Sequence, residues 1–144
     1  MLVSQILKSK GDQGVVTVKP GTSVSDVAKI LAEKRIGTVV VSPDGTTAQG
    51  ILSERDIVRE LASSGSGCLT QTVESYMTTE LVTCVMGDDA VDVLAKMTEG
   101  RFRHMPVMEG ETLVGLITLG DAVKARLSEL AMEKDALEGM IMGH

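Results

Sequence analysis

Two segments of the chain combine residues that can bind a polar ligand. Residues 50–56 and 115–121 both follow the order Gly, two apolar residues, Ser or Thr, two further residues and Asp. Ser53 and Thr118 stand where a strand is expected to give way to a helix, so each hydroxyl lies beside the free backbone N–H groups of the first helical turn. The helix dipole makes such a junction attractive to anions, a phosphate group included.

Asp56 and Asp121 follow one helical turn later on the same face. A carboxylate accepts two hydrogen bonds, which suits the paired hydroxyls of a ribose. A ligand that carries both phosphate and ribose is a nucleotide, so the motif is compatible with a nucleotide site. The alternative is that Ser53 and Thr118 are ordinary helix N-caps and that the two Asp side chains only stabilise the first turn.

A basic cluster lies within residues 101–107. Arg103 and His104 stand out there in a chain of net charge −6, and Arg binds phosphate through a forked pair of N–H donors. The equivalent residues earlier in the chain are Gly37 and Thr38, so we expect two sites that differ in ligand or affinity. A solvated basic turn, with His104 in a structural role, is the alternative.

Signals of catalysis are weak. The two histidines, His104 and His144, form no Ser/His/Asp or Cys/His set, and neither glycine-rich phosphate-loop motif occurs. The Asp88–Asp89 pair is better explained by a helix start than by a metal site. Cys68 and Cys84 match no metal motif and are expected to be reduced thiols, although a regulatory disulfide stays open. We therefore predict no catalytic residues and no metal site.

The composition excludes several classes of partner. The chain has 144 residues with one Phe, one Tyr and no Trp. Nucleic acid is disfavoured, because its binding relies on Lys, Arg and aromatic stacking. No apolar run approaches the ~20 residues that span a membrane, and the N-terminus lacks the features of a signal peptide. We expect a cytoplasmic protein with an aliphatic and Met core and with neither nucleic acid nor membrane as partner.

An internal repeat organises the chain. Residues 16–41 match residues 82–107 at a shift of 66, and after a one-residue deletion residues 50–56 match 115–121 at a shift of 65. Two units are too few for a solenoid. We therefore predict that they pack against each other as a pseudo-twofold pair.

Each unit predicts the order β-α-β-β-α, which is an α/β (α+β) fold with a C-terminal helix added. A linker is expected at 63–67 from its Ser and Gly content. In the first unit we expect strands at 15–18, 38–41 and 49–52, a helix capped by Thr22 or Ser23, and a helix over 56–62. In the second we expect strands at 81–85, 105–108 and 113–117, a helix capped by Asp88 or Asp89, and a helix from 121 onward.

The segment 122–141 is predicted to be one helix with an apolar stripe. The stripe recurs at spacings of three and four residues and is interrupted by Lys134. Its apolar members are Val123, Leu127, Leu130, Leu137 and Ile141. The stripe could pack across a dimer interface or on the helix's own domain, and the sequence favours neither.

Taken together, these motifs resemble a tandem pair of CBS domains, named for cystathionine β-synthase, and in particular the small stand-alone bacterial CBS-pair proteins. The resemblance covers nearly the whole chain. It rests on the two repeated motifs and on Ser53–Val58, Tyr76–Thr78, Met97–Val107 and Gly120–Lys124. The implied boundaries are repeat one at 1–66 (core 15–62), repeat two at 67–127 (core 81–127) and an extension at 128–144.

The resemblance implies two clefts between the repeats that bind adenosyl ligands: AMP, ADP, ATP, NAD(H) or S-adenosylmethionine. It implies that Asp56 and Asp121 bind ribose and that Ser53 and Thr118 contact phosphate. The remaining implied contacts are the Thr17–Val18 and Thr83–Cys84 backbones for adenine, Arg103 and His104 for the phosphates of the second site, Arg55 near the first, and Met105–Pro106 as an apolar wall. Thr38, at the position of His104 in the first unit, completes the candidate set.

The resulting hypothesis is a regulatory module without catalysis. It would bind an adenine nucleotide, form a homodimer and signal to a partner protein in trans. The rival hypothesis is a structural or interaction protein whose clefts are vestigial.

Overall fold

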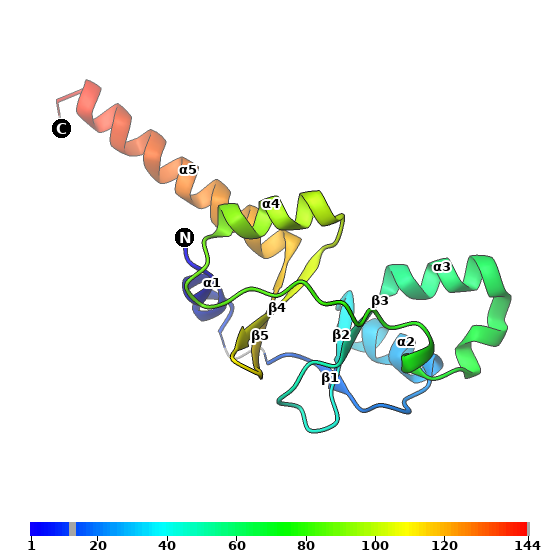
Figure 1. Ribbon diagram of the computed structural model, residues 1–144. Helices are drawn as coiled ribbons and strands as arrows, with labels where there is room; N and C mark the ends of the chain where they lie inside the picture. The colour runs from blue at the N-terminus through cyan, green and yellow to red at the C-terminus, as the bar shows by residue number, and fades with distance from the viewer. Residues whose placement is uncertain (12–13, 144) are drawn as a thin grey trace.

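The computed structural model describes residues 1–11 and 14–143; residue 144, the last of the predicted extension, lies outside the described residues. The chain forms two lobes, each built on one repeat, and one long helix leads away from them (Figure 1). The first repeat forms β1 (Thr17–Val18), α2 (Val24–Lys34), β2 (Thr38–Val41), β3 (Gly50–Ser53) and α3 (Glu54–Ser64). Its sheet has the order β1-β2-β3, with β1 parallel to β2 and β2 antiparallel to β3.

The second repeat forms α4 (Ala90–Gly100), β4 (His104–Glu109), β5 (Thr112–Thr118) and α5 (Leu119–Ile141). The strand predicted at 81–85 is wrong, because only an isolated parallel bridge joins Cys84 to Val107. In the first repeat the Val40 N–H donates to the Val16 carbonyl. Pro106 occupies the position of Val40 and has no N–H to donate, so the second repeat cannot form that bond.

The helix caps agree with the predicted pattern. Ser23, rather than Thr22, accepts a hydrogen bond from the Asp26 N–H at 3.1 Å. Asp89, rather than Asp88, accepts one from the Val91 N–H at 3.0 Å. These caps start α2 and α4 at equivalent places, so the strand that follows each helix is equivalently placed too.

The N-terminal helix α1 (Val3–Lys10) was not predicted, and it packs on the second repeat. The Val3 N–H donates to the Asp88 carbonyl at 2.8 Å, and the Ala90 N–H donates to the Met1 carbonyl at 2.9 Å. The segment that precedes the core of the first repeat is therefore tied to the start of α4 in the second.

The segment between the repeats makes the reciprocal crossing. The predicted linker at 63–67 does connect the repeats, but it is helical: α3 continues to Ser64 and is followed by the 3₁₀ helices η1 (Gly65–Thr70) and η2 (Val73–Ser75). The Val24 N–H donates to the Gln71 carbonyl and the Val73 N–H to the Thr22 carbonyl, both at 2.9 Å. Each lobe therefore contains the segment that precedes the core of the other repeat.

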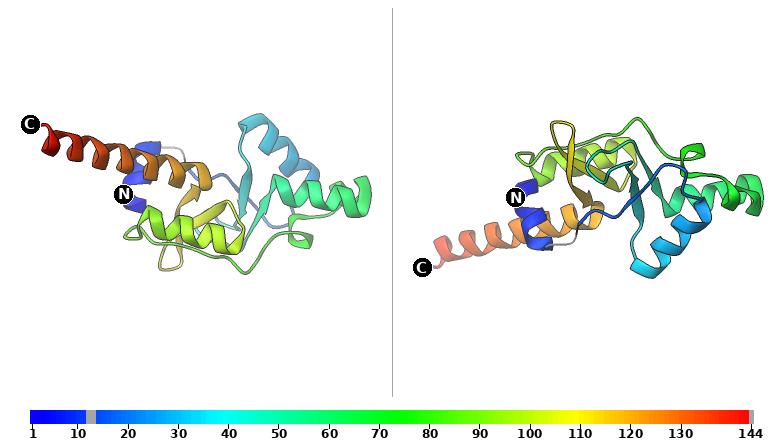
Figure 2. Two further views of the ribbon diagram at one scale, coloured as in Figure 1. Left: turned by 90° about the horizontal axis from the view of Figure 1, so that it is seen from above. Right: turned by 90° about the horizontal axis from the view of Figure 1, so that it is seen from below.

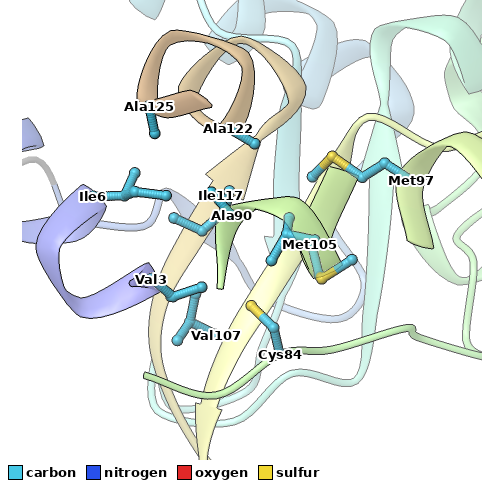
Figure 3. Close-up of a cluster of buried hydrophobic side chains, with 11 residues drawn as sticks. Val3, Ile6, Cys84, Ala90, Met97, Met105, Val107, Ile117, Ala122 and Ala125 are labelled. Atoms are coloured by element: carbon cyan, nitrogen blue, oxygen red, sulfur yellow. The ribbon is translucent and has the colours of Figure 1, made fainter. Parts of the chain in front are cut away.

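Two aliphatic cores result from this exchange. Figure 3 shows the core of the second lobe, where Val3 and Ile6 of α1 face the side chains of β4, β5 and α4. The core of the first lobe includes Val73 of η2. Neither cluster of buried residues contains an aromatic side chain among the described residues. Val, Leu and Ile fill the first core, and the second adds Ala, Cys84, Met97 and Met105, as the composition predicts.

The predicted C-terminal helix is confirmed as α5, and its second half extends beyond the lobes (Figure 2). Only Ala122 and Ala125 of this helix are buried. The predicted stripe is exposed in the single chain, from 40% at Val123 to 84% at Ile141. The stripe therefore does not pack on its own domain.

Candidate functional site

A cleft of about 400 Å³ lies between the two repeats and is lined by both of them. The first repeat contributes the β3–α3 junction, and the second contributes the turn between α4 and β4. The residues lining it are Gly37, Thr38, Ile51, Ser53–Asp56, Arg59, Thr78, Glu80–Val82 and Gly100–His104. A second cavity is lined by Glu54, Arg55, Val58 and Arg59 and opens on α3.

The Ser53–Asp56 junction forms a reciprocal capping box at the wall of the cleft. The Ser53 Oγ accepts a hydrogen bond from the Asp56 N–H at 3.2 Å. The Asp56 Oδ2 accepts bonds from the Ser53 N–H and from the Ser53 hydroxyl, both at 2.9 Å. The second oxygen, Oδ1, lies 3.5 Å from a nitrogen of Arg59, a side chain that is largely exposed. The predicted N-cap role is present, and Oδ1 remains available to a ligand that displaces Arg59.

Arginine side chains gather along the same cleft. Arg55 and Arg59 come from α3, whereas Arg101 and Arg103 come from the turn before β4. Arg101 ends α4 in the left-handed conformation, with φ of 57°. The cations exceed the three carboxylates of this lining, so the cleft is locally basic in an acidic chain.

His104 lies half-buried in this cleft, against Gly37 of the other repeat. A Cβ atom added to Gly37 would lie 3.3 Å from the His104 Nε2, so a larger residue there would press on the imidazole. Burial lowers the pKa of His104, and the nearby Arg103 acts in the same direction against the opposing Glu54 carboxylate. The imidazole is therefore neutral near pH 7 and can donate or accept a hydrogen bond.

The structure brings Arg103 and His104 to Ser53 and Asp56, whereas the resemblance had assigned them to the site of Thr118 and Asp121. The Glu54 N–H donates to the Gly37 carbonyl, and the Leu119 N–H donates to the Arg103 carbonyl, both at 2.8 Å. These equivalent bonds hold the turns 37–38 and 103–104 beside the equivalent helix starts. The contact of His104 with Gly37 then joins the two turns across the pseudo-twofold axis.

The predicted adenine segments are also distributed differently. Thr17 and Val18 are absent from the described lining of the large cleft. The segment 78–82, which leads into Thr83 and Cys84, lines it instead, and Thr78 is tied to Ile51 by two backbone hydrogen bonds of 3.0 and 2.8 Å. The sequence analysis did not assign Thr78, Glu80 or Val82 to the site, because a crossing between repeats leaves no signal in the repeat pattern.

Three of the candidate residues have structural contacts. Thr38 is buried, and its hydroxyl donates to the Leu52 carbonyl at 3.0 Å, although the residue also borders the cleft. Met105 and Pro106 are buried in β4 and do not appear among the described lining residues.

Both cysteines are free and buried. Burial raises the pKa of the Cys84 thiol to about 11, and the Asp88 carboxylate adds to the increase. A thiol so protonated is a weak nucleophile at neutral pH. Nothing in these surroundings supports a redox role for Cys84.

Thr118 and Asp121 form the second capping box. The Asp121 Oδ2 accepts from the Thr118 N–H at 2.9 Å, and the Thr118 Oγ accepts from the Asp121 N–H at 3.1 Å. The same Oδ2 also accepts from Lys10 Nζ at 2.7 Å. Burial would raise the pKa of Asp121, but the hydrogen bonds from Lys10 and Thr118 outweigh it and lower the pKa. Among the described residues, Thr118 and Asp121 line neither cavity.

No group of three or more His, Cys, Asp or Glu side chains is placed to hold a metal ion within residues 1–11 and 14–143. No helix in these ranges is both long enough and apolar enough to cross a membrane.

Comparison with known proteins matches the CBS domain twice, over residues 3–63 and 73–128. The fold is similar to that of the CBS-domain containing protein ATU1752 from Agrobacterium tumefaciens, with 40% identity, a TM-score of 0.83, and coverage of 88% of this chain and 99% of that one. It is also similar to the CBS domain protein PAE2072 from Pyrobaculum aerophilum complexed with AMP, with 25% identity, a TM-score of 0.77, and coverage of 92% and 99%. The Arabidopsis thaliana mitochondrial CBS domain-containing protein CBSX3 is 29% identical over 98% of this chain and 72% of its own length.

Proposed function

Because the chain belongs to the CBS-domain family as a tandem pair of these domains, we propose that it is a regulatory module that binds an adenine nucleotide in the cleft at Asp56. The observation that supports this most is the meeting of the Ser53–Asp56 junction with Arg103 and His104 in one cleft. Asp56 would hold the ribose hydroxyls. Ser53, Arg103 and His104 would contact the phosphates, and the 78–83 backbone would recognise the base.

The charge of the cleft predicts which of the candidate ligands bind more tightly. Arg55, Arg59, Arg101 and Arg103 all line it, and arginine favours phosphate oxygens through charge-assisted hydrogen bonds. AMP, ADP, ATP and NAD(H) carry phosphates, whereas the sulfonium of S-adenosylmethionine is a cation that this lining repels. We therefore expect phosphate-bearing ligands to bind more tightly. The similarity to a CBS protein complexed with AMP supports the same class.

We propose that the chain regulates a partner protein in trans and does not catalyse a reaction itself. The cleft holds one half-buried histidine, and the hydroxyls of Thr38 and Ser53 in the same lining donate to the Leu52 carbonyl and to Asp56. In this proposal a bound nucleotide would therefore bias a conformation rather than react. In that account a cytoplasmic partner protein reads the change, because a ligand shifts an equilibrium by its difference in affinity for two states.

A homodimer is the second element of the proposal. The exposed stripe of Val123, Leu127, Leu130, Leu137 and Ile141 has the helical spacing of an interface. A second copy of the chain would cover it. Light scattering of the purified protein should give a dimer, and Leu127→Glu combined with Leu137→Glu should give a monomer that still binds AMP. A wild-type monomer at all concentrations would overturn this element.

Isothermal titration with AMP, ATP, NADH and S-adenosylmethionine tests nucleotide binding. We expect heat with at least one phosphate-bearing ligand and at least about tenfold weaker binding in Asp56→Asn, which weakens a hydrogen bond to a charged acceptor. Asp121→Asn is the matched control and should bind as the wild type does. If the folded protein binds none of the four, the rival account of a structural protein with vestigial clefts is favoured.

A further inference from the structure

The two Asp junctions receive different side chains from the segments that cross between the lobes. A Cβ atom added to Gly50 would lie 2.6 Å from the Met77 Sδ, and one added to Gly115 would lie 2.7 Å from the Leu7 Cδ1. Gly50 and Gly115 open the two repeated motifs, so Met77 and Leu7 occupy equivalent places over them. The crossing segments can therefore be aligned on these two residues.

Three residues further along each crossing segment, the charges are opposite. Glu80 follows Met77 and lines the cleft at Asp56. Lys10 follows Leu7 and reaches the second junction, where its Nζ lies 2.7 Å from the Asp121 Oδ2 and 3.0 Å from the Leu116 carbonyl oxygen. Glu80 cannot pair with a carboxylate, whereas Lys10 neutralises one.

The Lys10 contact is better formed than the ion pair in the other cleft. The Lys10 and Asp121 side chains are both about one-quarter exposed, at 24% and 22%. The Arg59 side chain beside Asp56 is 69% exposed and its nitrogen lies 3.5 Å from the carboxylate. A ligand would displace Arg59 at little cost, because exposed ion pairs contribute little. A ligand that displaced Lys10 from Asp121 would exchange the charge-assisted hydrogen bond to this carboxylate for a weaker one from a neutral ribose hydroxyl.

The second junction lacks cations at the positions of Arg55 and Arg103, although Lys124 and Arg35 stand at the positions of Arg59 and Arg101. Gly37 and Thr38 stand at the positions of Arg103 and His104, and Gly120 stands at the position of Arg55. No charged side chain at these three positions would stabilise a phosphate group in place of the lost Lys10 hydrogen bond.

We propose that Lys10 occupies the ligand position at the Thr118–Asp121 junction and that it excludes ligand there, so that each chain binds one nucleotide. Its ammonium group takes the carboxylate that would otherwise bind ribose. Lys10 thereby determines the binding stoichiometry. This inference rests on the proposed function only in taking the Asp56 cleft as the occupied one.

The test compares binding stoichiometry with AMP and with adenosine as probes. The wild type should bind one AMP per chain by titration. Lys10→Met should bind a second equivalent, at least about tenfold more weakly and with less preference for AMP over adenosine than the Asp56 cleft has, because Arg55 and Arg103 have no cationic equivalent there. The double variant Lys10→Met/Asp121→Asn should return to one equivalent.

Lys8→Met is the matched control, because Lys8 is an exposed lysine on the same helix, and it should behave as the wild type. Lys10→Gln keeps a donor for the Leu116 carbonyl, and it replaces Lys10→Met if that variant does not fold. A wild type that binds two equivalents, the second lost in Asp121→Asn, would overturn the inference. So would folded Lys10 variants that gain nothing.

The result separates the two proposals. If the wild type binds no nucleotide, the proposed function fails at the Asp56 cleft. A gain in Lys10→Met that depends on Asp121 would support the role of Lys10 even then, and the lack of any gain would count against it.

Discussion

The helix-start junctions at Asp56 and Asp121 share one backbone arrangement but differ in the side chains that surround them. Both Asp residues close a capping box with the hydroxyl residue three positions earlier, with nearly the same hydrogen-bond lengths. The differences come from elsewhere in the chain. Asp56 lines a cleft together with Glu80, Arg103 and His104, whereas Asp121 is held by Lys10. The charges of Asp121 and Lys10 also act on His104.

This difference shows that duplication copies a local cap more faithfully than it copies a site. The cap depends on residues three positions apart in one segment, so it is retained whenever that segment is retained. The cleft depends on what the opposite repeat and the crossing segments contribute. Each of these can change without affecting the cap.

The largest effect that we predict concerns the two cores, which the crossing segments join. Leu52 and Ile117 are equivalent and fully buried, so Leu52→Ala and Ile117→Ala should each lower the free energy of unfolding by about 3 kcal/mol. Because each core includes a segment from the other half, urea unfolding followed by circular dichroism should remain a single transition in both variants.

Val91→Ala is the control, since Val91 is 47% exposed on α4, and it should change stability by about 0.5 kcal/mol or less. Two separate transitions in either core variant would mean that the lobes are independent. The Asp56 and Asp121 junctions would then belong to two independently folding domains.

The second prediction concerns phosphate recognition in the Asp56 cleft. Arg103→Met should weaken AMP binding by roughly 10-fold to 100-fold, because a hydrogen bond to a charged group contributes about 1.5–3 kcal/mol. Adenosine binding should hardly change. Lys124→Met is the control, because Lys124 is an exposed cation one turn beyond Asp121. Equal losses in both variants would indicate a general charge effect instead of a phosphate contact.

Much of the fold could be predicted from the sequence, because its signals are local and occur twice. The strands at 38–41 and 113–117, the helix starts at Ser23 and Asp89, and the long C-terminal helix all follow from periodicity and capping. The strand predicted at 81–85 is wrong because the repeat suggested a ladder that Pro106 interrupts. The helix α1 was missed because it has no equivalent helix in the repeat pattern and its apolar residues Val3 and Ile6 are few.

The candidate site was predicted only within each repeat. Ser53, Asp56, Thr118 and Asp121 could be identified from the motif, and Arg103 and His104 from their charge. Which Asp the basic pair faces depends on packing across the pseudo-twofold axis, and sequence periodicity does not contain that information. The contact of Lys10 with Asp121 spans 111 residues, which places it beyond any local rule.

The third prediction compares the two cations that contact the Asp side chains. Lys10→Met should lower the free energy of unfolding by about 1–2 kcal/mol, since it removes a charge-assisted hydrogen bond to a partly buried carboxylate. Arg59→Met should change it by about 0.5 kcal/mol or less, because exposed ion pairs contribute little. Thermal or urea unfolding of the two variants without ligand measures this directly. Equal effects would remove the energetic distinction between the two junctions.

The smallest effect concerns His104, whose pKa is lowered in the folded protein, chiefly by burial. A histidine with a lowered pKa binds its proton more readily in the unfolded chain, so folding stability falls as the pH drops below the ordinary value of 6.5. Asp121 acts in a lower pH range. Its lowered pKa stabilises the fold above pH 3.8, and this stabilisation is lost only in stronger acid. Between pH 7.5 and 5.5 the decrease should therefore report the imidazole, and His104→Gln should flatten it while Lys10→Met should not. If the stability of His104→Gln decreased by the same amount over this pH range, the imidazole would not be the group responsible. The Asp56 cleft would then not disfavour the protonated form of His104.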